Sequence, residues 1–230
     1  MQYDTIFFDL DHTLWDFETN SREALLELSD KYKLLSKGVD TFENFIQKYF
    51  DINERMWDEY RKGIIDKEAL RHNRFHEALK LYDIDDYALA QKIGTDYTAI
   101  APYKSNVFPH AIETLSYLAE KYPLYIITNG FEEVQHIKLK HSKLEHFFKD
   151  VITSERAGFK KPDERIFHFS LDVAKAKPET SIMIGDSLEA DVLGAKNVGM
   201  HHVYFNPDEK EHAEDLTYEI KSLKELLEIL

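Results

Sequence analysis

Four aspartates stand closely behind short apolar runs of the sequence. They are Asp9 and Asp11, after the run that ends at Phe8, and Asp186 and Asp191, after the run that ends at Ile184. Residues two apart in an extended chain point to the same side, so Asp9 and Asp11 are expected to share a face. Carboxylates gathered within a few ångströms repel one another unless positive charge joins them. The sequence therefore predicts a cation at this site.

Two other segments offer partners for these acids. The apolar run 124–127 ends in Thr128 and Asn129, and Lys161 stands before Pro162 farther along the chain. A lysine can neutralise phosphoryl oxygens, while a threonine hydroxyl and backbone N–H groups can donate hydrogen bonds to them. Carboxylate and carbonyl oxygens are the ligands that Mg²⁺ prefers, and the ion keeps part of its hydration shell.

Together these residue types suit phosphoryl chemistry. Asp9, the carbonyl of Asp11 and Asp186 would hold Mg²⁺, with waters completing its coordination. Lys161 and Thr128 would hold the phosphoryl oxygens, and a carboxylate that faces the phosphorus can act as a nucleophile. The sequence thus indicates a Mg²⁺-dependent phosphoryl site, which requires a fold that brings these segments together.

Alternating strand and helix patterns supply such a fold. The expected strands cover 5–8, 124–127, 151–152, 181–184 and 202–205, and the expected helices cover 109–121, 133–140, 164–174, 188–198 and the C-terminal segment behind the capping box 222–225. This alternation is typical of a doubly wound, Rossmann-like α/β core with a parallel sheet. Ligands of such sheets bind at the carboxyl ends of the strands, where the four aspartates are expected. Residues 207–219 are interpreted as a solvated loop.

The segment between the first two expected strands has a different rhythm. Aromatic and aliphatic residues recur there at helical spacing, and no strand pattern interrupts them. We expect residues 18–101 to form an all-helical cap domain, inserted into a core made of residues 1–17 and 102–230. The cap aromatics are interpreted mainly as packing, and Arg71 and Arg74 as partners in surface ion pairs.

Composition narrows the class of protein. The 230 residues carry 29 Lys and Arg against 43 Asp and Glu, a formal net charge of −14, and no Cys. The charge argues against a nucleic-acid polymer or an anionic membrane as partner, and the missing Cys excludes disulfides and a cysteine nucleophile. Without a signal-peptide pattern or a stretch of ~20 apolar residues, we expect a soluble, cytoplasmic protein. Its partner would be a small phosphorylated metabolite.

The ordered motifs resemble the haloacid dehalogenase-like (HAD) hydrolase superfamily, specifically its phosphatases. The resemblance is carried by Asp9-x-Asp11-x-Thr13, Thr128, Lys161 and Gly185-Asp186 followed by Asp191, in this order. The insert after the first motif is similar to the small cap type of that superfamily. The more common motif has Gly at the position of His12. Stretches around Asp9–Phe17, Thr128–Phe131 and Lys161–Asp163 further resemble the YjjG-type pyrimidine 5′-nucleotidase branch.

The resemblance implies a role for each residue. Asp9 would attack the phosphorus and become an aspartyl-phosphate, and Asp11 would act as general acid and then general base. The remaining roles are phosphoryl binding by Thr128, by the Asn129 backbone and by Lys161, Mg²⁺ binding by Asp9, Asp11 and Asp186, and orientation of the lysine or a metal-bound water by Asp191. The implied activity is that of a Mg²⁺-dependent phosphomonoesterase acting on nucleoside 5′-monophosphates.

Other functions remain open at the level of sequence. The substrate could be a phosphoglycolate-like or sugar-phosphate-like metabolite, because the cap selects the substrate and its sequence is hard to interpret. A phosphomutase would share these motifs and would require a bisphosphorylated activator. A phospho-accepting binding protein without turnover would not need Asp11 as a base. Dehalogenation within the same fold does not use the acid that Asp11 provides.

Overall fold

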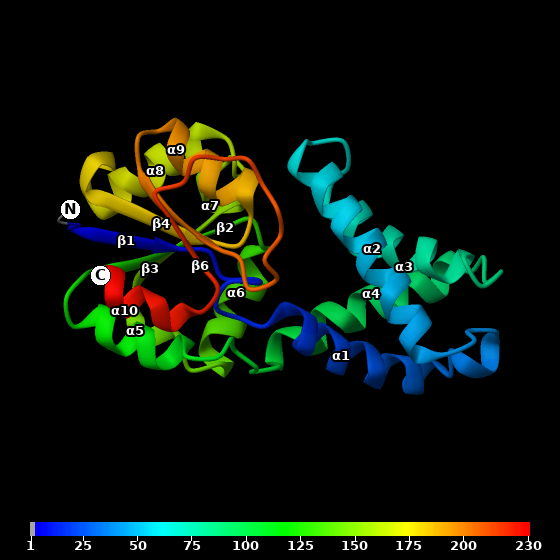
Figure 1. The fold of residues 1–230 in the computed structure, drawn as a ribbon. Coiled ribbons are helices and arrows are strands. Elements are labelled where there is room, and N and C mark those ends of the chain that lie inside the picture. The colour runs from blue at the N-terminus through cyan, green and yellow to red at the C-terminus, as the bar shows by residue number, and fades with distance from the viewer. Residues whose placement is uncertain (1–2) are drawn as a thin grey trace. The chain divides into compact units, whose positions relative to one another are not determined.

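A computed structural model describes residues 3–230, shown as a ribbon in Figure 1. Residues 1 and 2, at the start of the expected core, lie outside the described part. The chain divides into two compact units: residues up to Phe17 join Ser105–Leu230 in the first, and Glu18–Lys104 form the second. The second boundary thus falls before Ser105, whereas the sequence pattern placed it before Pro102.

The first unit is built on a six-stranded sheet in which every neighbouring pair is parallel. Its strands are β1 (Thr5–Phe8), β2 (Leu124–Thr128), β3 (Phe148–Thr153), β4 (Ser181–Gly185), β5 (His201–Phe205) and β6 (Tyr218–Ile220). They lie in the order β3-β2-β1-β4-β5-β6, so the direction of winding reverses between β1 and β4. Such a reversal opens a crevice at the carboxyl ends of the strands. The doubly wound α/β fold predicted from the sequence is confirmed.

Helices cover both faces of this sheet. Figure 1 shows α5 (Ala111–Ala119) and α10 (Leu226–Ile229) on one face, and α8 (Glu164–Ala174) and α9 (Gly194–Asn197) on the other. On the α8 side, Phe7, Ile127, Ile152 and Met183 pack against Ile166, Phe167 and Leu171. Because both faces are covered, the central strands β1 and β4 are buried along their whole length. The unit also contains the helices α6 (Glu132–His141) and α7 (Ser154–Ala157) and the short turns η3 (Glu145–Phe147), η4 (Pro178–Thr180) and η6 (Leu223–Glu225).

Three local expectations were only partly right. Pro109 is not the first residue of a helix, since His110 has a left-handed backbone (φ 67°) and α5 begins at Ala111. The expected helix 188–198 begins as a wide π-helix, η5 (Leu188–Leu193), before α9. The loop expected up to residue 219 ends in β6, a short edge strand that pairs with β5.

The second unit is helical. Its elements are α1 (Phe17–Tyr32), which starts at the boundary, η1 (Leu35–Lys37), α2 (Phe42–Arg61), α3 (Lys67–Lys80), α4 (Tyr87–Ile100) and η2 (Ala101–Tyr103). Phe45, Tyr49, Phe75 and Tyr97 are buried together in its core, as the helical spacing of the aromatics predicted. Within residues 3–230, no helix combines the length and apolar character needed to cross a bilayer.

The two arginines of α3 differ in their surroundings. Arg71 forms the expected ion pair, with Glu68. Arg74 does not, because it is only 3% exposed, donates to Asn53 Oδ1 over 2.8 Å and lies 5.0 Å from the centroid of the Tyr97 ring. The expected surface ion pair of Arg74 was therefore wrong. Amide and aromatic contacts hold this guanidinium inside the helical unit.

Candidate active site

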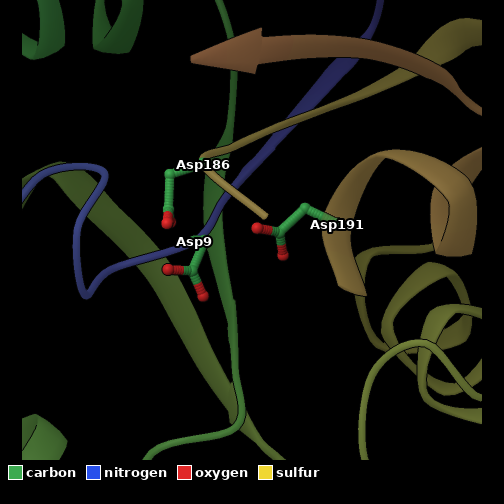
Figure 2. A group of neighbouring side chains, drawn as sticks. All are labelled: Asp9, Asp186 and Asp191. Atoms are coloured by element: carbon green, nitrogen blue, oxygen red, sulfur yellow. The ribbon is translucent and has the colours of Figure 1, made fainter. Parts of the chain in front are cut away.

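Three carboxylates meet at the carboxyl edge of the sheet. Asp9 follows β1, Asp186 follows β4, and Asp191 lies in η5. One oxygen from each lies within 4.8 Å of the other two, and Figure 2 shows the side chains turned toward one another. The hydrogen bond from Asp9 N to Ile184 O, 2.8 Å long, extends the pairing of β1 with β4 up to this point. The central strands thereby deliver the acids to one place.

Lys161 is the cation among these acids. It is only 2% exposed, and its ammonium donates to Asp9 Oδ1 (2.5 Å), Asp191 Oδ1 (2.6 Å) and Ile127 O (2.6 Å). An ammonium has three donors, so all of them are used. The structure thus places Lys161, and not the neighbouring Lys160, beside Asp9.

The loop after β2 fixes the backbone of this lysine. The Asn129 side chain donates to Lys161 O over 2.9 Å and accepts from Lys161 N over 2.8 Å. Thr128 is buried, and its hydroxyl oxygen accepts from Gly130 N over 3.0 Å. Asn129 therefore has a side-chain contact that sequence reasoning, which assigned only its backbone, did not foresee.

Asp186 and Asp191 are each held by a second contact. The Thr13 hydroxyl donates to Asp186 Oδ1 over 3.0 Å and accepts from Asp186 N over 3.1 Å. Ser187 N donates to Asp191 Oδ2 over 3.0 Å. A Cβ atom at Gly185 would lie 2.3 Å from Asp191 Oδ2, so only glycine lets this carboxylate come so close to the backbone. These contacts leave the acids little freedom to turn away from Asp9.

Asp11 lies in a tight turn and does not belong to the three-carboxylate cluster. Leu14 N and Trp15 N both donate to Leu10 O, and His12 adopts φ 63°. A left-handed conformation favours glycine, which explains the glycine of the more common motif, and histidine is among the residues that tolerate it. The Asp11 carboxylate accepts hydrogen bonds from α6 instead. The Asp9 carboxylate is held by Lys161, and the Asp11 carboxylate by Gln135 and Lys138, so the two acids have different partners.

Burial disfavours the charged form of two of these carboxylates. It raises the pKa of Asp9 well above its usual range, although Lys161 opposes the shift. It also raises the pKa of Asp186 to about 6, against the opposing charge of His12. Burial alone would lower the pKa of Lys161, but Asp191 and Asp9 raise it above the ordinary value. The ammonium thus stays charged, while the buried acids are incompletely compensated.

The donor set fits a divalent cation. Three carboxylates face one ammonium, which leaves two negative charges uncompensated. The ligand atoms that the three acids offer are all carboxylate oxygens, which suit a hard ion such as Mg²⁺. Lys161 and Ser187 N already occupy both oxygens of Asp191. Asp9 and Asp186 are therefore better candidates for ligands than Asp191, and the ligand role of the Asp11 carbonyl stays a prediction.

Sequence reasoning identified most of these residues but missed several neighbours. The structure brings Asp9, Lys161, Asp186 and Asp191 together, with Thr128 and Asn129 in the adjoining loop. The residues it missed are the two donors to Asp11, which are Gln135 and Lys138, and Ser187. The sequence offered no signal for the first two, because the burial of their side of α6 is known only from the structure.

A comparison with protein families shows to which family the chain belongs. The haloacid dehalogenase-like hydrolase family matches residues 3–199. The chain belongs to this family. The predicted resemblance and the prediction of a hydrolase are thereby confirmed. The matched range includes every residue of the site described above.

Relatives match over nearly their whole length. The HAD-hydrolase YfnB of Bacillus subtilis is 31% identical over 100% of this chain and 96% of its own. Its crystal structure, which contains bound magnesium, has a TM-score of 0.90 and covers 100% of this chain and 99% of the YfnB chain. The pyrimidine 5′-nucleotidase YjjG of Escherichia coli is 30% identical (100% and 99% covered). The glyceraldehyde 3-phosphate phosphatase of Methanothermobacter thermautotrophicus is 31% identical (96% and 98% covered).

Proposed function

We propose that this protein is a Mg²⁺-dependent phosphomonoesterase that acts through an aspartyl-phosphate on Asp9. The observation that carries the proposal is the buried lysine that joins Asp9 to Asp191 beside Asp186. Such a site lacks positive charge until a divalent cation arrives, and a phosphoryl group requires the same cationic surroundings. Mg²⁺, held by Asp9, Asp186 and the Asp11 carbonyl, would neutralise the charge of the phosphoryl oxygens.

The first step forms the covalent intermediate. A carboxylate oxygen of Asp9 attacks the phosphorus while the bond from phosphorus to the ester oxygen breaks, and Asp11 gives its proton to the departing alkoxide. Lys161 and Thr128 hold phosphoryl oxygens during the transfer. Asp191 keeps the lysine in place, and Asn129 keeps its backbone in place.

The second step regenerates the enzyme. A water molecule attacks the phosphorus of the aspartyl-phosphate, and Asp11, now a carboxylate, takes its proton. The bond between phosphorus and the Asp9 oxygen breaks and releases inorganic phosphate. Asp11 thus ends the cycle protonated, ready to donate to the next leaving group.

Nucleoside 5′-monophosphates, pyrimidine ones in particular, are the substrates that we propose. The support is the full-length similarity to YjjG, together with the motif stretches shared with that branch. A second candidate is a small sugar or triose phosphate, which the similar identity to a glyceraldehyde 3-phosphate phosphatase favours. The same cluster of residues would serve either substrate.

Phosphate release from a substrate panel, with Mg²⁺ and with EDTA, tests this proposal. The panel contains uridine and adenosine 5′-monophosphates, glyceraldehyde 3-phosphate and phosphoglycolate. We expect the pyrimidine nucleotide to have the highest kcat/KM, and EDTA to reduce release at least about 100-fold, since a metal provides several kcal/mol of charge stabilisation. Faster release from the triose phosphate would favour the second candidate. Undiminished release in EDTA would contradict the role of the metal.

A further inference from the structure

Two side chains of α6 hold the carboxylate of Asp11 by its two oxygens. Lys138 Nζ donates to Asp11 Oδ1 over 2.5 Å, and Gln135 Nε2 donates to Asp11 Oδ2 over 3.2 Å. Gln135 and Lys138 stand three residues apart, so they project from the same side of the helix. Both are buried, at 1% and 5% exposure. The acid is therefore fixed from a helix that contributes nothing else to the site described above.

The burial of Lys138 is explained by this one partner. An ammonium taken out of water is costly unless it is paired. Among the described residues, Asp11 is the only carboxylate in ion-pair distance of Lys138. The ammonium also lies 4.2 Å from the centroid of the buried Trp15 ring. Packing alone would favour an apolar side chain at this position of α6.

Gln135 is likewise oriented by Asp11. Its amide donates to the carboxylate, whereas its Oε1 atom is buried without a hydrogen-bond partner in the described chain. A Cβ atom at Gly130 would lie 1.8 Å from Gln135 Nε2 and 3.3 Å from Asp11 Oδ2. The glycine of the loop after β2 thus makes room for the contact between Gln135 and Asp11.

We infer that Lys138 and Gln135 are positioning residues for the proton transfers of Asp11. The inference rests on the proposed function, in which Asp11 protonates the leaving group and then deprotonates water. Asp11 directly precedes the left-handed residue His12 and is absent from the mutually supported cluster of Asp9, Asp186 and Asp191. Its orientation therefore depends on α6. Positioned acid and base catalysis contributes about 10²- to 10⁴-fold, and misplacement by about 1 Å can cost about 100-fold.

The variant Lys138→Met tests this, because it removes the ammonium and keeps much of the length of the side chain. We expect kcat for an alkyl phosphate to fall about 10- to 100-fold while KM changes less than about 3-fold. Lys138→Arg, which restores a cationic donor, should recover part of the rate. The matched control is Lys140→Met, which removes the same charge from an exposed position of α6 and should leave both constants unchanged.

The leaving group separates positioning of the acid from general damage. p-Nitrophenolate departs without protonation, so the loss of kcat/KM in Lys138→Met should be at least about 5-fold smaller for p-nitrophenyl phosphate than for the alkyl ester. Gln135→Met, which leaves no unpaired buried charge, should show the same dependence on leaving group even if Lys138→Met does not fold. Equal losses on both esters, or wild-type rates in both variants, would overturn the inference while the proposed function stands. Absence of turnover by the wild-type protein would overturn the proposed function, and this inference with it.

Discussion

Replacing Asp9 with Asn should abolish phosphate release, with a loss of at least about 10³-fold in kcat, because an amide cannot form the aspartyl-phosphate. The fold should survive. The amide oxygen can still accept from Lys161, and the neutral side chain no longer repels Asp186 and Asp191. Steady-state phosphate release and thermal unfolding measure the two effects separately.

The control for this variant lies on the same segment of chain. Asp4→Asn removes the same charge from an exposed residue just before β1, at the opposite end of the strand, and should retain wild-type turnover. If Asp9→Asn kept more than about a tenth of the wild-type kcat, Asp9 would not be the nucleophile, and the proposed mechanism would be wrong.

Replacing Lys161 with Met should impair activity and stability together. The variant leaves the buried carboxylates of Asp9 and Asp191 without their shared cation, and breaking a buried ion pair from one side costs about 3–5 kcal/mol. We expect the free energy of unfolding in urea, without metal, to fall by about this amount. We also expect kcat/KM to fall at least about 100-fold, since a preorganised donor is lost.

Lys160 provides the matched comparison. Lys160→Met removes the same charge one residue earlier and should change the free energy of unfolding by less than about 1 kcal/mol. Similar losses of activity in the two variants would show that the charge of the loop matters in general, and that Lys161 has no special role. A fully active Lys161→Met variant would contradict the assignment directly.

The core of the fold was predictable because local patterns agree with its tertiary structure. The apolar runs that end at Phe8 and Ile184 became adjacent buried strands, and the parallel sheet carried their following acids to the same edge. Helix α8 has the predicted bounds, since an apolar stripe coincides with a cap in which Asp163 accepts from Arg165 N. Alternation of strand and helix was sufficient to predict the topology class.

The irregular elements were not predictable from such patterns. β6 contains only three residues within a charged stretch, and it is a strand because β5 offers it an edge. η5 widens beyond a regular helix while Asp191 reaches back to Ser187 N and to Lys161. These contacts depend on the folded site, which the periodicity of residues 188–198 does not describe.

The surroundings of Asp11 were the least predictable part of the site. Its contact with Lys138 joins residues separated by 127 positions, and the left-handed residue His12 directly follows it. Sequence motifs named Asp11 because its position matches the family. They could not show that α6 holds its carboxylate, because in the sequence Lys138 is only one of several polar residues in that helix.

Trapping the covalent intermediate tests the central claim most directly. Asp11→Asn lacks the base that activates water, so it should accumulate the phosphorylated protein when p-nitrophenyl phosphate and Mg²⁺ are supplied. After an acid quench, mass spectrometry should find one added phosphoryl group, and fragmentation should locate it on Asp9. The adduct should be absent when Asp9→Asn is added to this variant. A phosphoryl group on another residue, or a burst of p-nitrophenolate without any covalent adduct, would contradict the proposed mechanism.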